Sequence, residues 1–240
     1  MKIADIYNYL DNISPFELQE KWDNSGLNVG SMSDDVKRIV LSMDIDEQLL
    51  DELEPNTLLI THHPLIFSSL KAINYDKFPA SFIKKMIKKD ISLIAMHTNF
   101  DKSDLNRYVA LHVLHVDVIK EEDFVLYFEI NESFEDFCIK LKRAFNLESL
   151  KVVTCNRDVK RVALTTGSGA SLLSSIECDC FLTGDIKFHD AMLAKALQVA
   201  MVDITHFDSE KFFVDALYEK LNSLEIEIQK NMNRDPFETF

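Results

Sequence analysis

Three apolar runs in the first half of the chain show little alternation between hydrophobic and polar positions. They are RIVLSMD (38–44), TLLITHH (57–63) and ISLIAMH (91–97). This pattern is typical of strands that are buried on both faces, as in parallel sheets covered by helices. Segments with helical spacing separate the runs. The chain is therefore predicted to have an α/β fold with mainly parallel sheets.

The predicted helices follow from apolar spacing and from capping signals. A helix is expected after Ser14, because Ser14 can serve as N-cap, Pro15 can take the first helical position and Glu17 completes a capping box. Further helices are expected at Asp46–Leu53, Ala80–Lys89, Leu105–Leu114, Phe134–Phe145, Asp190–Leu197 and Glu210–Leu221.

A similar series of strands recurs in the second half, as RVALTTG (161–167), CFLTGD (180–185) and VAMVDITH (199–206). An offset of 122 residues relates Thr61 to Thr183 and Val40 to Val162. We predict two similar α/β domains, residues 1–122 and 123–240, that pack closely and meet near Glu121–Asp123. The alternative is coincidence, because apolar strands are common to all α/β segments.

Composition excludes several classes of function. The 240 residues are 47% hydrophobic and carry a formal net charge of -14, which argues against binding to nucleic acid or to an anionic membrane. The N-terminal segment lacks a secretory signal and no apolar run is long enough to span a membrane, so a cytoplasmic location is expected. The four cysteines show no paired zinc motif and are expected to be reduced, mostly buried thiols.

Five of the seven histidines follow predicted strands or lie in the loops after them: His62, His63, His97, His189 and His206. Ligands gather at the carboxyl ends of strands in open α/β sheets. Adjacent residues on a strand point to opposite faces, so His62 and His63 can converge only if the strand ends and Pro64 turns the chain. His112 and His115 lie on a helical segment and are expected to be partly packed surface residues.

Carboxylates accompany these histidines at short spacing. Asp101 follows His97 by four residues, and Glu210 follows His206 by four. If Asp208 or Ser209 caps the next helix, Glu210 lies in its first turn and faces back toward His206. Imidazole with carboxylate suits zinc, iron, manganese or nickel, and two histidines plus a carboxylate per ion predict two divalent ions per chain. Alternatively, Glu210 only stabilises a helix N-terminus.

The glycines occupy loops between predicted elements: Gly26, Gly30, Gly167, Gly169 and Gly184. The Gly167-Ser168-Gly169 turn could present backbone N–H groups to a phosphate. A plain tight turn explains the same spacing, because the third glycine and the acidic partner of a dinucleotide motif are missing.

Six motifs occur together in the order WDNSGLNVG, LLITHHPLIF, AMHTNFD, TGSGASLL, FLTGDIKFHDA and THFDSEK. In these motifs the chain resembles the NIF-three-like family, the GTP cyclohydrolase 1 type 2 homologues, over nearly its whole length. The resemblance implies two similar α/β domains with a dinuclear metal site in the cleft between them. It also implies assembly into a toroidal homohexamer.

Carried over motif by motif, the family's metal ligands correspond to His62, His63, Asp101, His206 and Glu210. By the same resemblance His97 and His189 lie near the metals and are candidates to contact substrate or transfer protons. One position departs from the pattern: many relatives have glycine before the last histidine, where this chain has Thr205. This departure affects the expected loop shape and leaves the ligand set intact.

The resemblance implies a hydrolase in which a metal-bound hydroxide attacks C8 of the guanine ring of GTP and formate is released. Two alternatives stay open, because fold and metals do not select a substrate. One is a dinuclear hydrolase of another substrate, such as a phosphoester or a cyclic amide. The other is a non-catalytic metal-binding regulatory or scaffold protein.

Overall fold

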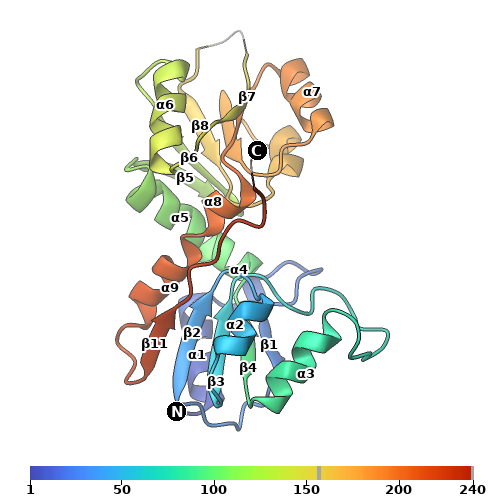
Figure 1. The fold of residues 1–240 in the computed structure, drawn as a ribbon. Helices are drawn as coiled ribbons and strands as arrows, with labels where there is room; N and C mark the ends of the chain where they lie inside the picture. Colours follow the sequence, from blue (N-terminus) through green and yellow to red (C-terminus); the bar gives the residue numbers. More distant parts are fainter. Residues whose placement is uncertain (156–157, 239–240) are drawn as a thin grey trace. The chain divides into compact units, whose positions relative to one another are not determined.

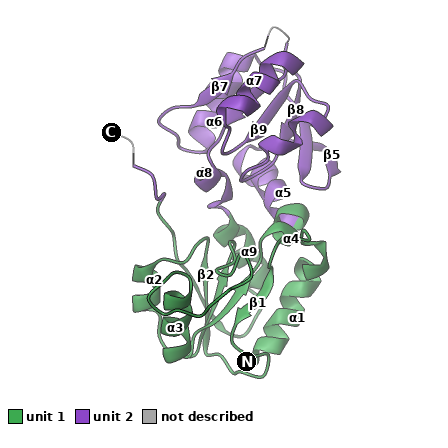
Figure 2. Ribbon diagram, turned by 90° about the vertical axis from the view of Figure 1, so that its right-hand side faces the viewer, with its two compact units in different colours: residues 1–103, 213–234 green, residues 104–212, 235–240 purple. Residues whose placement is uncertain are grey.

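The computed structural model describes residues 1–155 and 158–238, and these form two compact units (Figure 2). Unit 1 comprises residues 1–103 and 213–234. Unit 2 comprises residues 104–212 with the described residues from 235 onward. Each unit has one sheet, and the α/β fold class predicted from the sequence is confirmed.

The sheet of unit 1 is almost entirely parallel (Figure 1). Its strands are β1 (Gly26–Val29), β2 (Arg38–Ser42), β3 (Thr57–Thr61), β4 (Ser92–Ala95) and β11 (Glu227–Lys230). They lie in the order β1-β4-β3-β2-β11, and only the pairing of β1 with β4 is antiparallel. The helices are α1 (Ile3–Ile13), α2 (Glu47–Glu52), α3 (Ala80–Lys88), α4 (Thr98–Phe100) and α9 (Phe213–Leu221), with a 3-10 helix at Phe16–Leu18.

Helices cover both faces of this sheet, which explains why its strands show no alternation. Figure 2 shows α2 and α3 on one side and α1 on the other. Leu59 of β3 and Leu93 of β4 pack with Leu50 of α2 and Met86 of α3 in one core cluster. All five residues of β3 are buried. Because both faces of such strands are buried, an apolar side chain at any position along them stabilises the folded state.

Unit 2 has a parallel centre flanked by antiparallel strands. Its strands are β5 (Val118–Glu122), β6 (Val125–Glu129), β7 (Lys151–Val153), β8 (Arg161–Leu164), β9 (Cys180–Thr183) and β10 (Ala200–Asp203). The order is β5-β6-β8-β9-β10-β7, with β8, β9 and β10 parallel. The helices are α5 (Asn106–Tyr108), α6 (Phe134–Ala144), α7 (Phe188–Leu197) and α8 (His206–Glu210), with a 3-10 helix at Ala170–Ser175. π-helical turns occur at Asp101–Leu105 and Val109–Val113.

The two sheets share a topological core. In each, three successive parallel strands are neighbours, β2-β3-β4 and β8-β9-β10, and an antiparallel strand follows at the edge. The central strands end at Thr61 and Thr183, the residues related by the sequence offset. The domain boundary between residues 122 and 123 stays a prediction. The expected junction at Glu121–Asp123 belongs to the β5–β6 hairpin of unit 2, where Asp123 has φ 52°.

The helix predicted to start after Ser14 is wrong. Ser14 ends α1, with its backbone N–H donating to the carbonyl of Leu10, and only the 3-10 helix Phe16–Leu18 follows. The Ser14 hydroxyl accepts hydrogen bonds from Asn99 and Ser103 instead of capping a helix. Ser14 is therefore used for tertiary contacts, which local sequence rules do not report.

The other predicted helices exist with shifted ends. Helical structure begins at Thr98 rather than Leu105, α7 begins at Phe188 rather than Asp190, and the expected helix Glu210–Leu221 is two helices, α8 and α9. Helix α1 was not predicted. Within the described residues, no helix combines the length and hydropathy that crossing a membrane requires.

The cysteines are free thiols in different degrees of burial. Cys180 is fully buried, and Cys138, Cys155 and Cys178 are half-buried. Burial, followed by the charge of Asp179, raises the pKa of Cys178 to about 12. A thiol with so high a pKa stays protonated near neutral pH, so it is a poor metal ligand.

The core of unit 1 supplies a first test. Leu59→Ala removes a fully buried side chain from β3 and leaves a cavity. We expect the free energy of unfolding of unit 1 to fall by about 2–5 kcal/mol. Ile87→Ala on α3, where the side chain is 60% exposed, should change it by less than about 0.5 kcal/mol. Denaturant titration followed by circular dichroism measures both; equal effects would contradict this core assignment.

Candidate functional site

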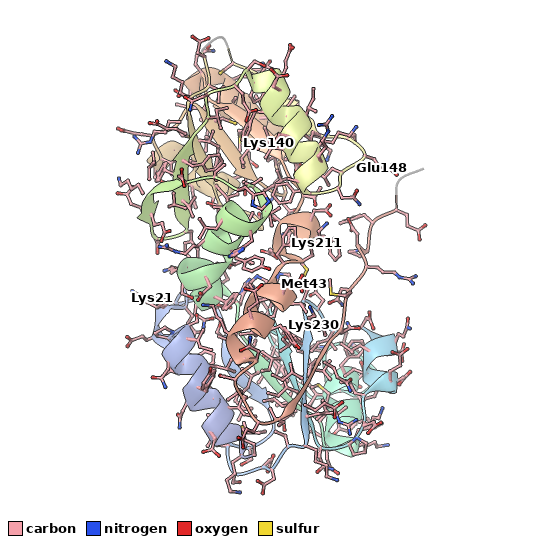
Figure 3. The ribbon with its side chains drawn as sticks, turned by 90° about the vertical axis from the view of Figure 1, so that its left-hand side faces the viewer. Lys21, Met43, Lys140, Glu148, Lys211 and Lys230 are labelled. Carbon is pink, nitrogen blue, oxygen red and sulfur yellow. The ribbon has the colours of Figure 1, made fainter. Side chains whose placement is uncertain are left out.

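The two adjacent histidines lie where the sequence places them, directly after the buried strand β3. The strand ends at Thr61, and the backbone N–H groups of His62 and His63 both donate to the carbonyl of Met43, which follows β2 and is labelled in Figure 3. The turn brings the imidazole ring centroids to 4.9 Å. Both rings therefore converge on one side, as expected for a strand that ends before the pair.

The hydrogen bond of His62 defines which ring nitrogen can bind a metal. Its Nδ1 lies 2.9 Å from the backbone carbonyl oxygen of Met96, just after β4. A carbonyl can only accept, so Nδ1 carries the proton and Nε2 keeps the lone pair. The ring is fully buried and packs against Phe213 with centroids 5.0 Å apart. This arrangement fixes the tautomer that metal-binding histidines use.

His97 is held by a buried carboxylate. Asp23 accepts hydrogen bonds from His97 Nδ1 at 2.8 Å, from Asn24 N–H, from Ser25 Oγ and from both the N–H and the hydroxyl of Thr98. Burial alone would raise the pKa of Asp23, but hydrogen bonds from His97 and Thr98 and the charge of His97 lower it well below its ordinary value. Asp23 therefore stays ionised and orients the imidazole of His97.

His63 has a more exposed partner. Its Nδ1 lies 2.9 Å from Oδ1 of Asp44, whose side chain is 50% exposed. The rings of His62, His63 and His97 form one group, with His97 5.2 Å from His62 and 5.4 Å from His63 between centroids. One nitrogen from each ring lies within 4.8 Å of the others, so this group could hold a metal ion.

Asp101 joins this group from the helical segment after β4. Its Oδ1 lies 3.5 Å from Nε2 of His62. Two ligand atoms about 2.1 Å from one ion lie roughly 3.0–3.4 Å apart at bond angles between about 90° and 110°. The spacing of His62 and Asp101 is therefore close to the separation expected of two ligands of one ion. Unit 1 thus gathers four predicted site residues, His62, His63, His97 and Asp101.

Unit 2 brings together the remaining two predicted ligands. His206 opens α8 and Glu210 closes it, with His206 Nε2 2.9 Å from Glu210 Oε2. The Nδ1 of His206 lies 2.8 Å from Oδ2 of Asp185. The expectation that Asp208 or Ser209 caps the helix is wrong, because Thr205 is the N-cap and its hydroxyl accepts from the N–H of Asp208. His206 and Glu210 are therefore one helical turn apart on the same face.

The glycine turn surrounds Glu210. Gly167 has φ 63°, and a Cβ there would collide with the Glu210 carboxylate. A Cβ on Gly184 would meet the backbone of Thr205 and His206. Glycine at these positions therefore leaves room for the carboxylate and for the turn that carries His206.

The turn does not present its glycine N–H groups to a phosphate. The N–H of Gly167 donates to Ser209 Oγ at 2.9 Å, and that of Gly169 donates to Thr183 Oγ1 at 2.7 Å. Both donors serve to hold the turn on β9 and α8. The plain-turn interpretation explains these two glycines better than phosphate binding.

His189 is separate from these groups. It lies on α7, is exposed and contacts the ring of Phe188 at 5.4 Å between centroids. Within the described residues, His189 belongs to none of the groups able to hold a metal. The sequence analysis also missed Asp23, Asp44 and Asp185, which hold the histidines. Their positions could have identified them, because Asp23 lies in the motif WDNSGLNVG and Asp44 and Asp185 follow the strands β2 and β9.

The hydrogen bonds of Asp23 predict unequal effects for two matched substitutions. Asp23→Asn keeps the shape of the side chain but replaces one acceptor oxygen by an NH2 group. Some of the groups that donate to Asp23 then lose their acceptor. We expect the free energy of unfolding of unit 1 to fall by about 2–4 kcal/mol. Asp44→Asn removes the same charge at a half-exposed site and should cost less than about 1 kcal/mol. Denaturant titrations in chelator measure both. A larger loss for Asp44→Asn would contradict this assignment.

The backbone of Thr205 gives another test. Its φ of 58° and ψ of 156° lie in a region that favours glycine, at an estimated cost of about 1–3 kcal/mol. Thr205→Gly relieves that strain and loses only a few tenths of a kcal/mol of capping. Thr205→Ala keeps the strain and loses about 1 kcal/mol. We expect thermal unfolding to rank glycine above threonine and threonine above alanine; alanine above glycine would refute the strain.

Comparison with known proteins agrees with these motifs. The family model described as Duf34/NIF3 (NGG1p interacting factor 3) matches residues 1–236. The chain is 44% identical to a Campylobacter jejuni protein named GTP cyclohydrolase 1 type 2 homolog, with all of both chains covered. It is 41% identical to GTP cyclohydrolase 1 type 2 of Helicobacter pylori, with 92% of each covered.

Solved structures show the same fold. A hypothetical protein of Staphylococcus aureus superposes with a TM-score of 0.85 at 27% identity, covering 100% of this chain and 99% of that one. The ordered motifs, the match over residues 1–236 and the fold all lead to one assignment: the chain belongs to the Duf34/NIF3 family.

Proposed function

We propose that this protein is a metal-dependent hydrolase that opens the ring of a nucleotide, with GTP as the candidate substrate. In this proposal His62, His63, Asp101, His206 and Glu210 bind two divalent ions per chain. The names of the relatives from Campylobacter jejuni and Helicobacter pylori support the substrate class.

One observation carries the proposal. The Nδ1 atoms of His62, His63 and His206 each lie 2.8–2.9 Å from an oxygen acceptor, which is Met96 carbonyl, Asp44 or Asp185. This is the arrangement in which a second group orients a metal-binding imidazole and directs its Nε2 to the ion. Two of these histidines follow β3 and the third follows β10, and the repetition of this arrangement at all three predicted histidine ligands favours ligation.

The donor set fits small divalent ions. Three imidazoles and two carboxylates suit zinc, iron, manganese or nickel. When bound, two such ions would polarise the bond under attack and lower the pKa of the attacking water. In a protein with a net charge of -14, that positive charge would favour the binding of a triphosphate at the site.

His97 is the residue of this chain best placed to move a proton. Asp23 accepts from its Nδ1, so Nε2 is the basic nitrogen and can take a proton from water and return it to a ring nitrogen. The reaction consumes two waters: one adds at C8 and breaks a C–N bond of the imidazole ring, and the second releases formate. His189, on the exposed start of α7, stays a prediction for proton transfer.

Assembly into a toroidal homohexamer and a cytoplasmic location are parts of the same proposal that rest on the sequence alone. A dinuclear hydrolase with another substrate and a non-catalytic metal-binding scaffold are the competing functions. The experiment below separates all three.

The test counts metal ions and measures formate together. We expect about two ions per chain in protein purified without chelator, by elemental mass spectrometry, and formate release from GTP. His63→Ala and Glu210→Ala should lose metal and formate release. His112→Ala, at an exposed helical site, should keep both.

Each other outcome decides against part of the proposal. Equal metal in all four proteins, or none in any, would contradict the ligand assignment. Two ions without formate release would exclude GTP ring opening and favour another substrate. Partner binding and assembly that persist in Glu210→Ala, with no turnover of any nucleotide by the parent, would favour the scaffold.

A further inference from the structure

Two large aromatic side chains are exposed beside the histidine group of unit 1. Trp22 is 57% exposed and Phe67 is 54% exposed. Their ring centroids lie 5.7 Å apart, and both contact His97, at 6.1 and 6.3 Å. Many large apolar side chains of this chain are exposed, but these two rings are paired beside His97 and together offer an aromatic surface on which a flat ligand could stack.

The two loops that carry these rings are fastened to each other. Asn24 Nδ2 donates to the carbonyl of Ile66 at 2.6 Å, and Ile66 N–H donates to Asn28 Oδ1 at 3.5 Å. These bonds join the segment after Trp22 to Ile66, the residue before Phe67. The pair of rings is therefore a preorganised platform, which lowers the entropy lost when a ligand binds.

Phe67 also belongs to a cavity of about 400 Å³ in the following loop. Lys71 and Lys77 line this cavity together with Ser68 and Ser69. Among the ion pairs of the described residues, neither lysine takes part. In a chain with an excess of carboxylates, two such cations beside hydroxyl groups favour an anionic group.

We propose that the Trp22–Phe67 platform and the adjoining cavity form a nucleotide subsite, in which the base stacks on the rings and the phosphates lie toward Lys71 and Lys77. This inference rests on the proposed function for the identity of the nucleotide. The base is placed beside His97, whose Asp23-oriented imidazole contacts both rings. The platform thus accounts for a flat substrate at the histidine group, which metals alone do not select.

The chain provides its own probe, because Trp22 is its only tryptophan. The test titrates the intact protein with GTP, guanosine and tripolyphosphate and follows the fluorescence of Trp22. It is repeated with His63→Ala, so that binding is measured when turnover is removed. We expect GTP and guanosine to quench the emission of both proteins. Tripolyphosphate, which has no ring to stack, should leave it unchanged.

Variants separate the two parts of the subsite. Phe67→Ala should lower the affinity for GTP and for guanosine by about five- to 150-fold, the range for loss of one stacking contact. The double variant Lys71→Ala with Lys77→Ala should lower the affinity for GTP and leave the affinity for guanosine unchanged. Phe188→Ala, which removes a 74% exposed ring from unit 2, should bind both as the parent does. Calorimetry measures the Trp22 variants, which lack the fluorescent probe. Trp22→Ala should lose affinity for GTP and guanosine, and Trp22→Phe should keep most of it.

Two results would overturn the subsite. One is unchanged GTP affinity in Phe67→Ala and Trp22→Ala. The other is a changed mass of the assembly in these variants, by light scattering, with unchanged nucleotide affinity, which would make the platform an interface between copies. Quenching by guanosine without formate release would keep the subsite and contradict ring opening. Formate release that neither Phe67→Ala nor Trp22→Ala affects would keep ring opening and contradict the subsite.

Discussion

The hydrogen bond from His62 Nδ1 to the carbonyl of Met96 is the constraint on which the unit 1 site depends. It joins the ends of two neighbouring parallel strands, β3 and β4. Parallel pairing places both carboxyl ends at one edge of the sheet, so a ring leaving one strand meets a carbonyl leaving the next. Because that carbonyl cannot donate, the tautomer of His62 follows from the sheet itself. The side chains that gather here, His63, His97 and Asp101, all leave the same edge.

The sequence predicted the strands β3 and β4 and the site residues that follow their carboxyl ends. It did not predict the partners that orient those residues. Buried strands such as Thr57–Thr61 have a local signature, because both faces need apolar side chains. Strand β11 has none: Glu227–Lys230 is mostly exposed and becomes a strand only by pairing with β2. Likewise Asp23 and His97 are 74 residues apart, and no local pattern relates them. Ser14 shows the opposite error, where a strong local signal yields to tertiary hydrogen bonds.

The carboxylates that orient the histidines differ in burial. Asp23 is fully enclosed and is satisfied by five donors, so its charge survives burial. The stability it provides is present above its ordinary pKa and is lost only as the pH falls through the lowered value. Asp44 and Asp185 are about half exposed, so solvent also contacts their carboxylates. Asp23 therefore holds His97 in one orientation, which suits the proton transfer proposed for it.

The glycine turn of unit 2 and the aromatic loops of unit 1 have opposite physical characters. Around Gly167 and Gly184 the backbone approaches Glu210 and His206 so closely that no side chain fits, and the two glycine N–H groups of the turn already donate to Ser209 and Thr183. Such a turn can position a carboxylate but has little surface left for a ligand. Trp22 and Phe67 instead leave their rings exposed, while a hydrogen bond from Asn24 to the carbonyl of Ile66 joins the segments that carry them. In the proposed subsite the surface that receives a flat substrate therefore belongs to unit 1, while the close packing of the turn leaves room only for the Glu210 carboxylate.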